Sequence, residues 1–433
     1  MATVDTVQPI AWWKEPTKDQ WMTWVAAWLG WTLDAFDFTI FLLIMVPIAE
    51  DFKVPLTEVT TVFTLTLWMR LVGATASGWL PDRIGRKTPL MISIAWYSAS
   101  NFIAAFSPSF WFLFLFRALL GIGMGAEWPV GAALAMENWP MRSRGFMGSV
   151  LQASWGLGAM LSSAAYGLFY TYFESFGKGY GWRGLLAIGV LPAFLIIYVR
   201  KFVKEPPVWL ENRRLQRTQH REVHVPLFKI FKRNMLGNTL TACWMMASAF
   251  VVGYSIGGLF PSYLQKDLHL SPTPWLVALP VLLQSAAFFL SGSLWGWFAD
   301  RIGRRWAIML TAALTIPIAP LYLMTTDYTM IVVFFALQGF FGAGGMHVQY
   351  PHYLSERFPT EVRATAAGFV YHQGAIFGGL VGPSLAYLAI EMHMGFAYPM
   401  LIATTLGCVS LILAMVISPE TRGKELVADL VIA

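Results

Sequence analysis

The sequence has little charge and almost no cysteine. Asp, Glu, Lys and Arg make up 12% of its 433 residues and 57% are hydrophobic, whereas soluble proteins carry about 25% charged residues. A soluble chain of this composition would lack the polar surface to cover itself, which excludes a soluble enzyme, a disordered protein and a nucleic-acid-binding protein. Two cysteines, Cys243 and Cys408, are too few for a disulfide scaffold or a Cys-based zinc site. We therefore expect lipid to be the solvent for most of the chain.

The hydrophobic residues gather in runs long enough to cross a bilayer, which takes about 20 residues per helix. The first run starts at Trp21 and is too long for a cleavable signal peptide. The predicted fold is an all-α membrane protein with twelve transmembrane helices in two six-helix pseudo-symmetric bundles. The predicted spans are 21–48, 58–80, 88–107, 110–136, 145–170, 183–200, 234–263, 274–298, 306–325, 328–353, 364–389 and 396–417.

Basic residues indicate the orientation. Most of the 30 Lys and Arg lie in segments on the side of the termini, whereas the opposite loops hold Lys53, Lys178, Arg183 and Lys266. The positive-inside rule then predicts cytoplasmic termini in a plasma membrane, which in a bacterium is the inner membrane. The same distribution explains the net charge of +6 without nucleic acid as a partner.

One long basic stretch divides the chain. We expect a cytoplasmic N-terminal segment at 1–20, a six-helix bundle at 21–200, a basic cytoplasmic linker at 201–233, a second six-helix bundle at 234–417 and a cytoplasmic tail at 418–433. The linker is interpreted as a solvated segment, with contact to lipid headgroups as the alternative.

An internal repeat relates the two halves. The segment 78–87 (GWLPDRIGRK) returns as 296–305 (GWFADRIGRR), and ExxPxxxR at 137–144 returns at 356–363. Two such repeats predict a substrate site between the halves, near the bilayer midplane. Aspartates in these loops can meet helix N-termini or neighbouring arginines, so the repeated residues are expected to form a conformational latch, with a purely topogenic role for the basic ones as the alternative. The predicted latch residues are Gly78, Asp82, Arg83, Arg86, Glu137, Arg144, Asp300, Arg301, Arg304, Glu356 and Arg363.

These motifs resemble a known family. The repeated loop is similar to the GxLxDRxGRK signature of the major facilitator superfamily, although Pro81 stands where that family usually has a small residue. RxxxGxGxG at 117–125 resembles its second motif, and PETRG at 419–423 its C-terminal motif. The resemblance covers essentially the whole chain and implies a secondary carrier that works by alternating access.

Ionisable residues inside the predicted spans are few, and all lie in the first half: Asp34, Asp37, Arg70, Arg117 and Glu127. Counted along their helices, the first four lie within about 10 Å of one another in depth. Such groups are costly in lipid and mark ion or proton pathways. We therefore predict proton coupling by Asp34, Asp37, Arg117 and Glu127. Permanent structural ion pairs are the alternative for the aspartates, and a bystander role for Glu127.

The first span narrows the resemblance. LDAFD at 33–37 resembles the DGxD pattern of proton-coupled organic-acid carriers, with Ala35 in place of Gly. Together with Arg70, GAE at 125–127 and ENWP at 137–140, it resembles the sialate/lactate:proton symporter family. That resemblance implies Asp37 and Arg117 as the coupling pair and symport of a small organic carboxylate, lactate or pyruvate first. The alternatives are a sialic acid, aromatic acid or sugar symporter, or a drug exporter, whose GxxxGPxxGG motif is missing from the fifth span.

Arg70 remains as an intramembrane base once Arg117 is assigned to coupling, so we predict that it binds the substrate carboxylate. Neutral polar residues of the second half are further substrate-binding candidates, with helix–helix hydrogen bonding as their alternative role: Asn238, Tyr254, His347, Gln349, Tyr371, His372 and Gln373. The expected partners are a small organic anion and the lipid bilayer, with a functional monomer and no cofactor or metal besides the coupling proton. A membrane-embedded enzyme or sensor is the rival class, and no metal spacing or Gly-x-Ser-x-Gly motif supports it.

Overall fold

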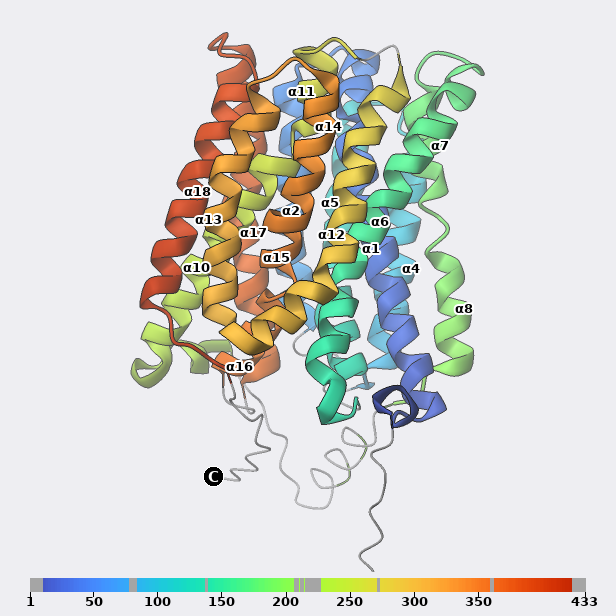
Figure 1. The fold of residues 1–433 in the computed structure, drawn as a ribbon. Coiled ribbons are helices and arrows are strands. Elements are labelled where there is room, and N and C mark those ends of the chain that lie inside the picture. The colour runs from blue at the N-terminus through green and yellow to red at the C-terminus, as the bar shows by residue number, and fades with distance from the viewer. Residues whose placement is uncertain are drawn as a thin grey trace, which may run out of the picture.

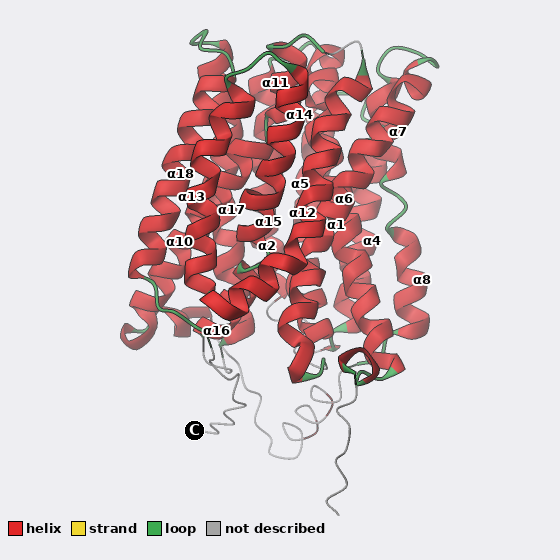
Figure 2. Cartoon of the chain, in the orientation of Figure 1, coloured by secondary structure: helices red, strands yellow, loops and turns green. Residues whose placement is uncertain are grey.

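The computed structural model of the chain describes residues 11–77, 84–136, 139–205, 210, 214, 227–270, 273–358 and 362–422. These residues form helices and no strand (Figure 2). The helices stand side by side along one axis, and both described ends of the chain lie at the same end of the molecule (Figure 1). We call this end the terminal side and the opposite end the far side. The predicted all-α membrane fold is confirmed.

The first half supplies six spans, the sixth of which is broken into two helices. A short 3₁₀ helix, η1 (Trp12–Lys14), precedes them. The spans are α1 (Lys18–Phe52), α2 (Leu56–Ser77), α4 (Lys87–Ala104), α5 (Phe110–Met136), α6 (Met141–Glu174), and α7 (Tyr180–Ile188) with α8 (Ala193–Phe202).

The second half follows the 3₁₀ helix η2 (Leu227–Phe231) and also has six spans. Its tenth span is interrupted by a π-helical segment, η3 (Gln338–Ala343). The spans are α10 (Arg233–Gly257) with α11 (Phe260–Lys266), α12 (Pro274–Ile302), α13 (Arg304–Leu323), α14 (Tyr328–Leu337) with η3, α15 (Gly344–His347) and α16 (Tyr350–Arg357), α17 (Arg363–Ile390), and α18 (Ala397–Ile417).

Ten spans are long and apolar enough by themselves to cross a membrane. The other two, α4 and α6, are held by their neighbours: α4 packs on α5, and α6 packs between α1 and α12. The α6–α12 contact joins the two halves along much of their length, so α6 is a central helix despite its polar residues.

Helix ends extend beyond the apolar runs because local capping continues the helix into polar sequence. At the start of α1, the Thr17 hydroxyl accepts a hydrogen bond from Gln20 N–H, and the Gln20 side chain accepts one from Thr17 N–H. This capping box satisfies two N–H groups of the first turn. At the other end Lys53 adopts a left-handed conformation, with φ of 55°, and ends the helix.

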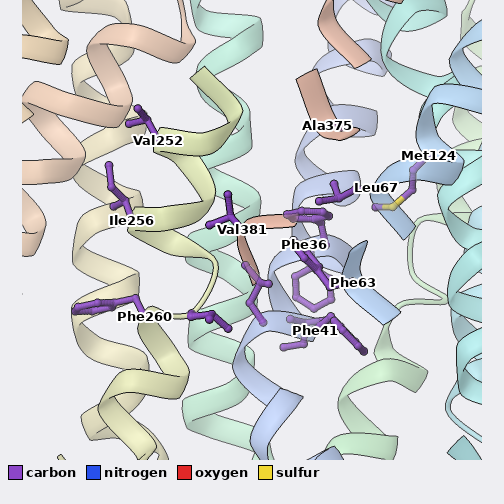
Figure 3. Packing of buried hydrophobic residues seen from close by; sticks show 14 of the residues in the cluster. Phe36, Phe41, Phe63, Leu67, Met124, Val252, Ile256, Phe260, Ala375 and Val381 are labelled. Carbon is purple, nitrogen blue, oxygen red and sulfur yellow. The ribbon is translucent and has the colours of Figure 1, made fainter. Parts of the chain in front are cut away.

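The main core cluster contains residues of both halves. Figure 3 shows part of it: Phe36, Phe41 and Phe63 lie near one another, and Val252 and Ile256 lie along α10. Because this cluster runs through both halves, the halves bury apolar surface against each other as well as within themselves.

The two halves use the same device at the terminal side. The Glu205 carboxylate accepts hydrogen bonds from the backbone N–H groups of Arg86 (2.8 Å) and Lys87 (2.9 Å), at the start of α4. In the second half Glu420 accepts from Arg304 N–H (3.0 Å) and Arg305 N–H (3.2 Å), at the start of α13. Each carboxylate therefore caps a helix N-terminus, where its charge is favoured.

Part of the predicted latch comes together around Arg304. Its guanidinium contacts Asp300 at 2.6 Å and Glu356 at 3.6 Å. Arg301 lies instead over the ring of Trp297, 3.6 Å from its centroid, so the structure does not bring it into this group. Four further predicted latch residues lie outside the part of the chain that the structure describes: Gly78, Asp82, Arg83 and Glu137. For Arg144 and Arg363 the structure describes the backbone and not the side chain.

Candidate functional site

A cavity of about 150 Å³ lies between the two halves. Three helices of the first half line it, namely α1, α2 and α6, and they face α10, α12, α14, η3, α15 and α17 of the second half. Of the predicted substrate-binding residues, the structure brings five to this cavity: Arg70, Tyr254, His347, Tyr371 and His372.

Arg70 is the cationic side chain among the described residues that line the cavity. Its Nη2 atom donates to Asp34 Oδ2 at 2.8 Å, and the two side chains are 5% and 0% exposed. Asp34 does not line the cavity, so it lies behind Arg70. The guanidinium has further N–H groups for which the described residues supply no second acceptor, and these are available to an anion in the cavity.

Close helix packing fixes the position of Arg70. The predicted motif at 117–125 puts Gly121 against the carbonyl of Thr66 and Gly125 against the carbonyl of Arg70. A Cβ atom at either glycine would overlap that carbonyl. Only glycine allows α5 to approach α2 this closely, which is the physical reason for the motif's spacing.

Aromatic rings form much of the cavity wall. The Arg70 guanidinium lies 5.5 Å from the ring centroid of Phe38 and 5.8 Å from that of Trp155. Tyr371 of α17 stacks on Trp128 of α5, with centroids 4.4 Å apart and planes at 12°. The site therefore presents one cation in an aromatic surround, an arrangement suited to an anionic group attached to an apolar body.

The two cavity histidines are held in the same way. Nδ1 of His347 lies 3.2 Å from the carbonyl oxygen of Ala343, and Nδ1 of His372 lies 2.9 Å from that of Gly368. Each carbonyl belongs to the residue four positions earlier. The backbone thus fixes the orientation of both rings.

Three predicted substrate-binding residues lie away from the cavity because they already bond elsewhere. Asn238 exchanges hydrogen bonds with Arg357 at 2.9 Å. Gln349 accepts from Arg304 at 3.3 Å, and Gln373 donates to the carbonyl of Cys243 at 2.8 Å. Their interactions are those of helix–helix contacts, the alternative role expected for them.

Asp37 and Arg117 lie on the other side of α1 from the cavity lining. No direct ion pair joins them in the described structure. Arg117 donates to Asn101 Oδ1 at 3.1 Å, and its guanidinium lies 4.1 Å from the ring centroid of Phe41. Asn101 also lies beside the Asp37 carboxylate, so it stands between the two charged groups. The family resemblance implies Asp37 and Arg117 as the coupling pair. The direct ion pair between these spans in the structure joins Asp34 to Arg70 instead.

Glu127 is buried on α5, with its Oε1 atom against Gly30 of α1. It lines a small cavity of about 10 Å³ together with Trp31 and Trp128, enough for roughly one water. Trp31 also lines the central cavity, so Glu127 lies beside that cavity without facing it. The role of Glu127 in proton coupling stays a prediction. Among the described residues there is no group of three or more side chains that could hold a metal ion.

The halves touch on both sides of the cavity. On the far side Lys266 pairs with Glu50 at 2.9 Å, and Thr64 donates to the carbonyl of Gly379 at 2.6 Å. On the terminal side His352 Nε2 lies 3.3 Å from the hydroxyl of Ser149. Contacts between the halves on both sides of a central cavity are those that alternating access requires to open in turn.

Several cavity residues were not predicted from the sequence. Gln152 accepts a hydrogen bond from the Trp128 ring N–H at 3.2 Å, and Gln284 and Ser285 line the opposite wall. Uncharged polar residues inside spans usually bond to neighbouring helices, so their residue type alone gave no signal. The position of Gln152 on the most polar central helix, α6, is the one feature that could have indicated it.

Comparison with known proteins agrees with this architecture. The family model described as Major Facilitator Superfamily matches residues 27–294 and 242–429. The probable 4-methylmuconolactone transporter of Cupriavidus pinatubonensis (strain JMP 134 / LMG 1197) is 28% identical, over 95% of this chain and 94% of that protein. The sialic acid transporter NanX of Escherichia coli (strain K12) is 24% identical, over 96% of this chain and 97% of that protein.

The crystal structure of a D-xylose-proton symporter has the same fold. It aligns with a TM-score of 0.71 at 18% identity, covering 94% of this chain and 100% of that one. The family match spans nearly the whole chain, and the named relatives are transporters. The chain is therefore a multi-pass membrane transporter, not an enzyme, and it belongs to the Major Facilitator Superfamily.

Proposed function

We propose that the protein is a proton-coupled symporter of small organic carboxylates, with lactate-like and pyruvate-like monocarboxylates as the first candidates. The observation that carries this proposal is the ion pair between Arg70 and Asp34, at 2.8 Å, on the edge of the central cavity. Arg70 can bind a carboxylate through its remaining N–H groups.

Charge balance explains how this pair couples the two solutes. Without substrate, ionised Asp34 and Arg70 carry no net charge. When a substrate carboxylate binds Arg70 and a proton binds Asp34, the site is again neutral. Either solute alone leaves one net charge in an apolar cavity, which is costly to move through the membrane interior. The carrier therefore reorients either empty or with both solutes, and one proton moves with each carboxylate without net charge transfer.

The aromatic wall favours a second candidate class, acids with an aromatic ring or another planar apolar body. Phe38, Trp155 and Tyr371 would contact such a body while its carboxylate binds Arg70. Relatives whose names mention a muconolactone and sialic acid support a cavity that accepts acids larger than lactate. Sugar symport and drug export are less consistent with a buried cation at this position.

The decisive experiment measures uptake of labelled lactate into proteoliposomes under an inward proton gradient, with and without a protonophore. We expect accumulation in the wild type that the protonophore abolishes. In Asp34→Asn the loaded site is neutral but the empty site carries the charge of Arg70, so net accumulation should stop while lactate–lactate exchange continues. Asp19→Asn, at an exposed ion pair with Lys204, is the matched control. Uptake that is indifferent to the gradient would refute symport.

The same proposal includes a bacterial inner membrane location with cytoplasmic termini, a functional monomer and no cofactor besides the coupling proton. Arg86, Lys87, Arg304 and Arg305 all lie at the terminal side, which supports that orientation. A cysteine introduced at Glu15 should react with a membrane-impermeant thiol reagent in inside-out vesicles and not in intact cells. Reaction in intact cells would reverse the orientation.

A further inference from the structure

His347 presents a fixed hydrogen-bond acceptor to the central cavity. His347 is the last residue of α15, the short helix that directly follows the π-helical segment η3. Its Nδ1 atom lies 3.2 Å from the carbonyl oxygen of Ala343. A carbonyl oxygen can only accept, so Nδ1 carries the hydrogen of this bond. In a neutral imidazole Nε2 then has a lone pair and no hydrogen.

The surroundings of the ring favour the neutral form. Phe288 and Tyr350 are its ring neighbours, with centroids 6.0 Å and 5.4 Å away. No acidic side chain pairs with it in the described part of the chain, and Arg70 already places a positive charge in the same cavity. A second, uncompensated cation in an apolar site would be costly.

Nε2 of His347 is open to a ligand. On α10, a Cβ atom at Gly253 would lie 3.3 Å from Nε2, so the glycine leaves the space beside that atom free. The described residues supply no hydrogen-bond donor to Nε2, and the side chain is partly exposed in the cavity. His372 has the same tautomer through Gly368, but its Nε2 is fully enclosed. His347 is thus the accessible member of the pair.

The opposite wall carries donors. Arg70 can only donate. The side-chain oxygen of Gln152 accepts from the Trp128 ring N–H at 3.2 Å, and its amide group, which can only donate, faces the Tyr371 hydroxyl at the cavity wall. The hydroxyl groups of Tyr254 and Tyr371 can donate or accept and so impose no direction. The first-half wall therefore donates through Arg70, and on the second-half wall His347 supplies an acceptor beside the polar groups of Gln284 and Ser285, which bond to each other at 3.3 Å.

From this polarity we infer that His347 accepts a hydrogen bond from a hydroxyl group of the substrate, so that the transported acids are hydroxycarboxylates. The inference rests on the proposed function, because it assumes that the substrate carboxylate binds Arg70. Propionate, which lacks the hydroxyl of lactate, would leave Nε2 unpaired in a desolvated site. Pyruvate would set a carbonyl lone pair against that of Nε2. Sites built to bond a substrate hydroxyl discriminate strongly against analogues that lack it.

The test compares half-saturating concentrations for gradient-driven uptake of lactate, propionate and pyruvate in proteoliposomes. Mandelate and phenylacetate repeat the comparison for acids with an aromatic body. In the wild type we expect the hydroxy acid to be preferred by about tenfold or more in each pair. In His347→Phe, which keeps a flat ring and removes the acceptor, the lactate-to-propionate preference should fall to about twofold or less, because lactate loses its bond and propionate had none. His347→Gln, whose side-chain oxygen can accept, should retain part of the preference.

Each outcome decides between the two proposals. Gradient-driven uptake of lactate and propionate with equal half-saturation in the wild type would overturn the hydroxyl inference and leave proton-coupled carboxylate transport intact. An unchanged preference in both His347 variants would also overturn it. If none of these acids enters under a proton gradient, the proposed function fails and this inference fails with it. If His347→Phe does not fold, the wild-type ratio together with His347→Gln still tests the inference.

Discussion

Gly125 of α5 lies so close to the carbonyl of Arg70 that a Cβ atom at this glycine would overlap the carbonyl oxygen. The side chain that carries the positive charge of the cavity is therefore positioned from its backbone. Gly121, one turn earlier, contacts the carbonyl of Thr66 in the same way. The glycines of the RxxxGxGxG motif at 117–125 therefore have a physical role, which is to set the distance between α5 and α2.

The first prediction concerns this contact. Gly125→Ala should force α2 away from α5, at a cost of about 1–3 kcal/mol in the free energy of unfolding, and should displace Arg70 from Asp34. We expect a lower unfolding temperature in detergent and reduced gradient-driven uptake. Gly237→Ala is the matched control, because no atom lies within 4 Å of a Cβ there, and it should unfold like the wild type or slightly later. Equal unfolding temperatures for the two variants would show that the helices adjust to the extra methyl group.

The second prediction separates the two aspartates of α1. Asp34 faces an arginine that borders a cavity, whereas Asp37 lies near Arg117, which is 0% exposed. The charge of Asp37 offsets that of Arg117 without a direct ion pair, so removing it leaves a buried cation uncompensated, which is costly. We expect Asp37→Asn to lower the unfolding temperature more than Asp34→Asn does. Asp37→Asn combined with Arg117→Gln should recover part of the loss. An Asp37→Asn protein as stable as the wild type would show that Asp37 is already protonated in the folded carrier.

The sequence predicted the spans and most charged residues of interest, but not how they pair. Hydropathy measures the apolar run, so the first predicted span begins at 21, whereas the Thr17 cap extends α1 into polar sequence from Lys18. Counting residues along a helix gives depth, and by depth either aspartate could meet Arg70 or Arg117. The choice between them depends on the rotation of each helix about its axis. That rotation is set by contacts such as Gly125 with Arg70, between helices far apart in the sequence.

A similar limit applies to the polar residues of the second half. His347 and Gln349 are two residues apart and were equal candidates, yet one lines the cavity and the other bonds to Arg304. The π-helical segment η3 shifts the register of the tenth span just before them. A regular 3.6-residue period from the sequence cannot anticipate that shift.

The third prediction tests the repeated carboxylate caps at the terminal side. Glu205→Ala exposes the N–H groups at the start of α4, and Glu420→Ala does the same at α13. Loss of such a cap costs about 1 kcal/mol. Each variant should lower the unfolding temperature by a few degrees. Glu58→Ala, in the first turn of α2 on the far side, is the control for loss of an acidic residue. Equal shifts in all three variants would show that general charge loss, not capping, is responsible.

The last prediction concerns the contacts that close the cavity on the far side. Thr64 donates to the carbonyl of Gly379 at 2.6 Å, and Trp68 donates to that of Ile376, so α2 is bonded to α17 across the two halves. Hydrogen bonds of this kind each contribute about 1 kcal/mol; the one from Thr64 is buried, whereas Trp68 is 39% exposed. Thr64→Val with Trp68→Phe should therefore favour opening at the far side by on the order of tenfold.

The readout is a cysteine introduced at Gly257, which lines the cavity and has no atom within 4 Å of a Cβ. In a background with Cys243 and Cys408 replaced, a membrane-impermeant thiol reagent added on the far side should label it faster in the double variant than in the parent. Ser149→Ala removes the terminal-side contact with His352 and should slow labelling from the far side, because it favours the opposite opening. Faster labelling in both would mean that these substitutions loosen the bundle as a whole, and the two contacts would then not act as opposing gates.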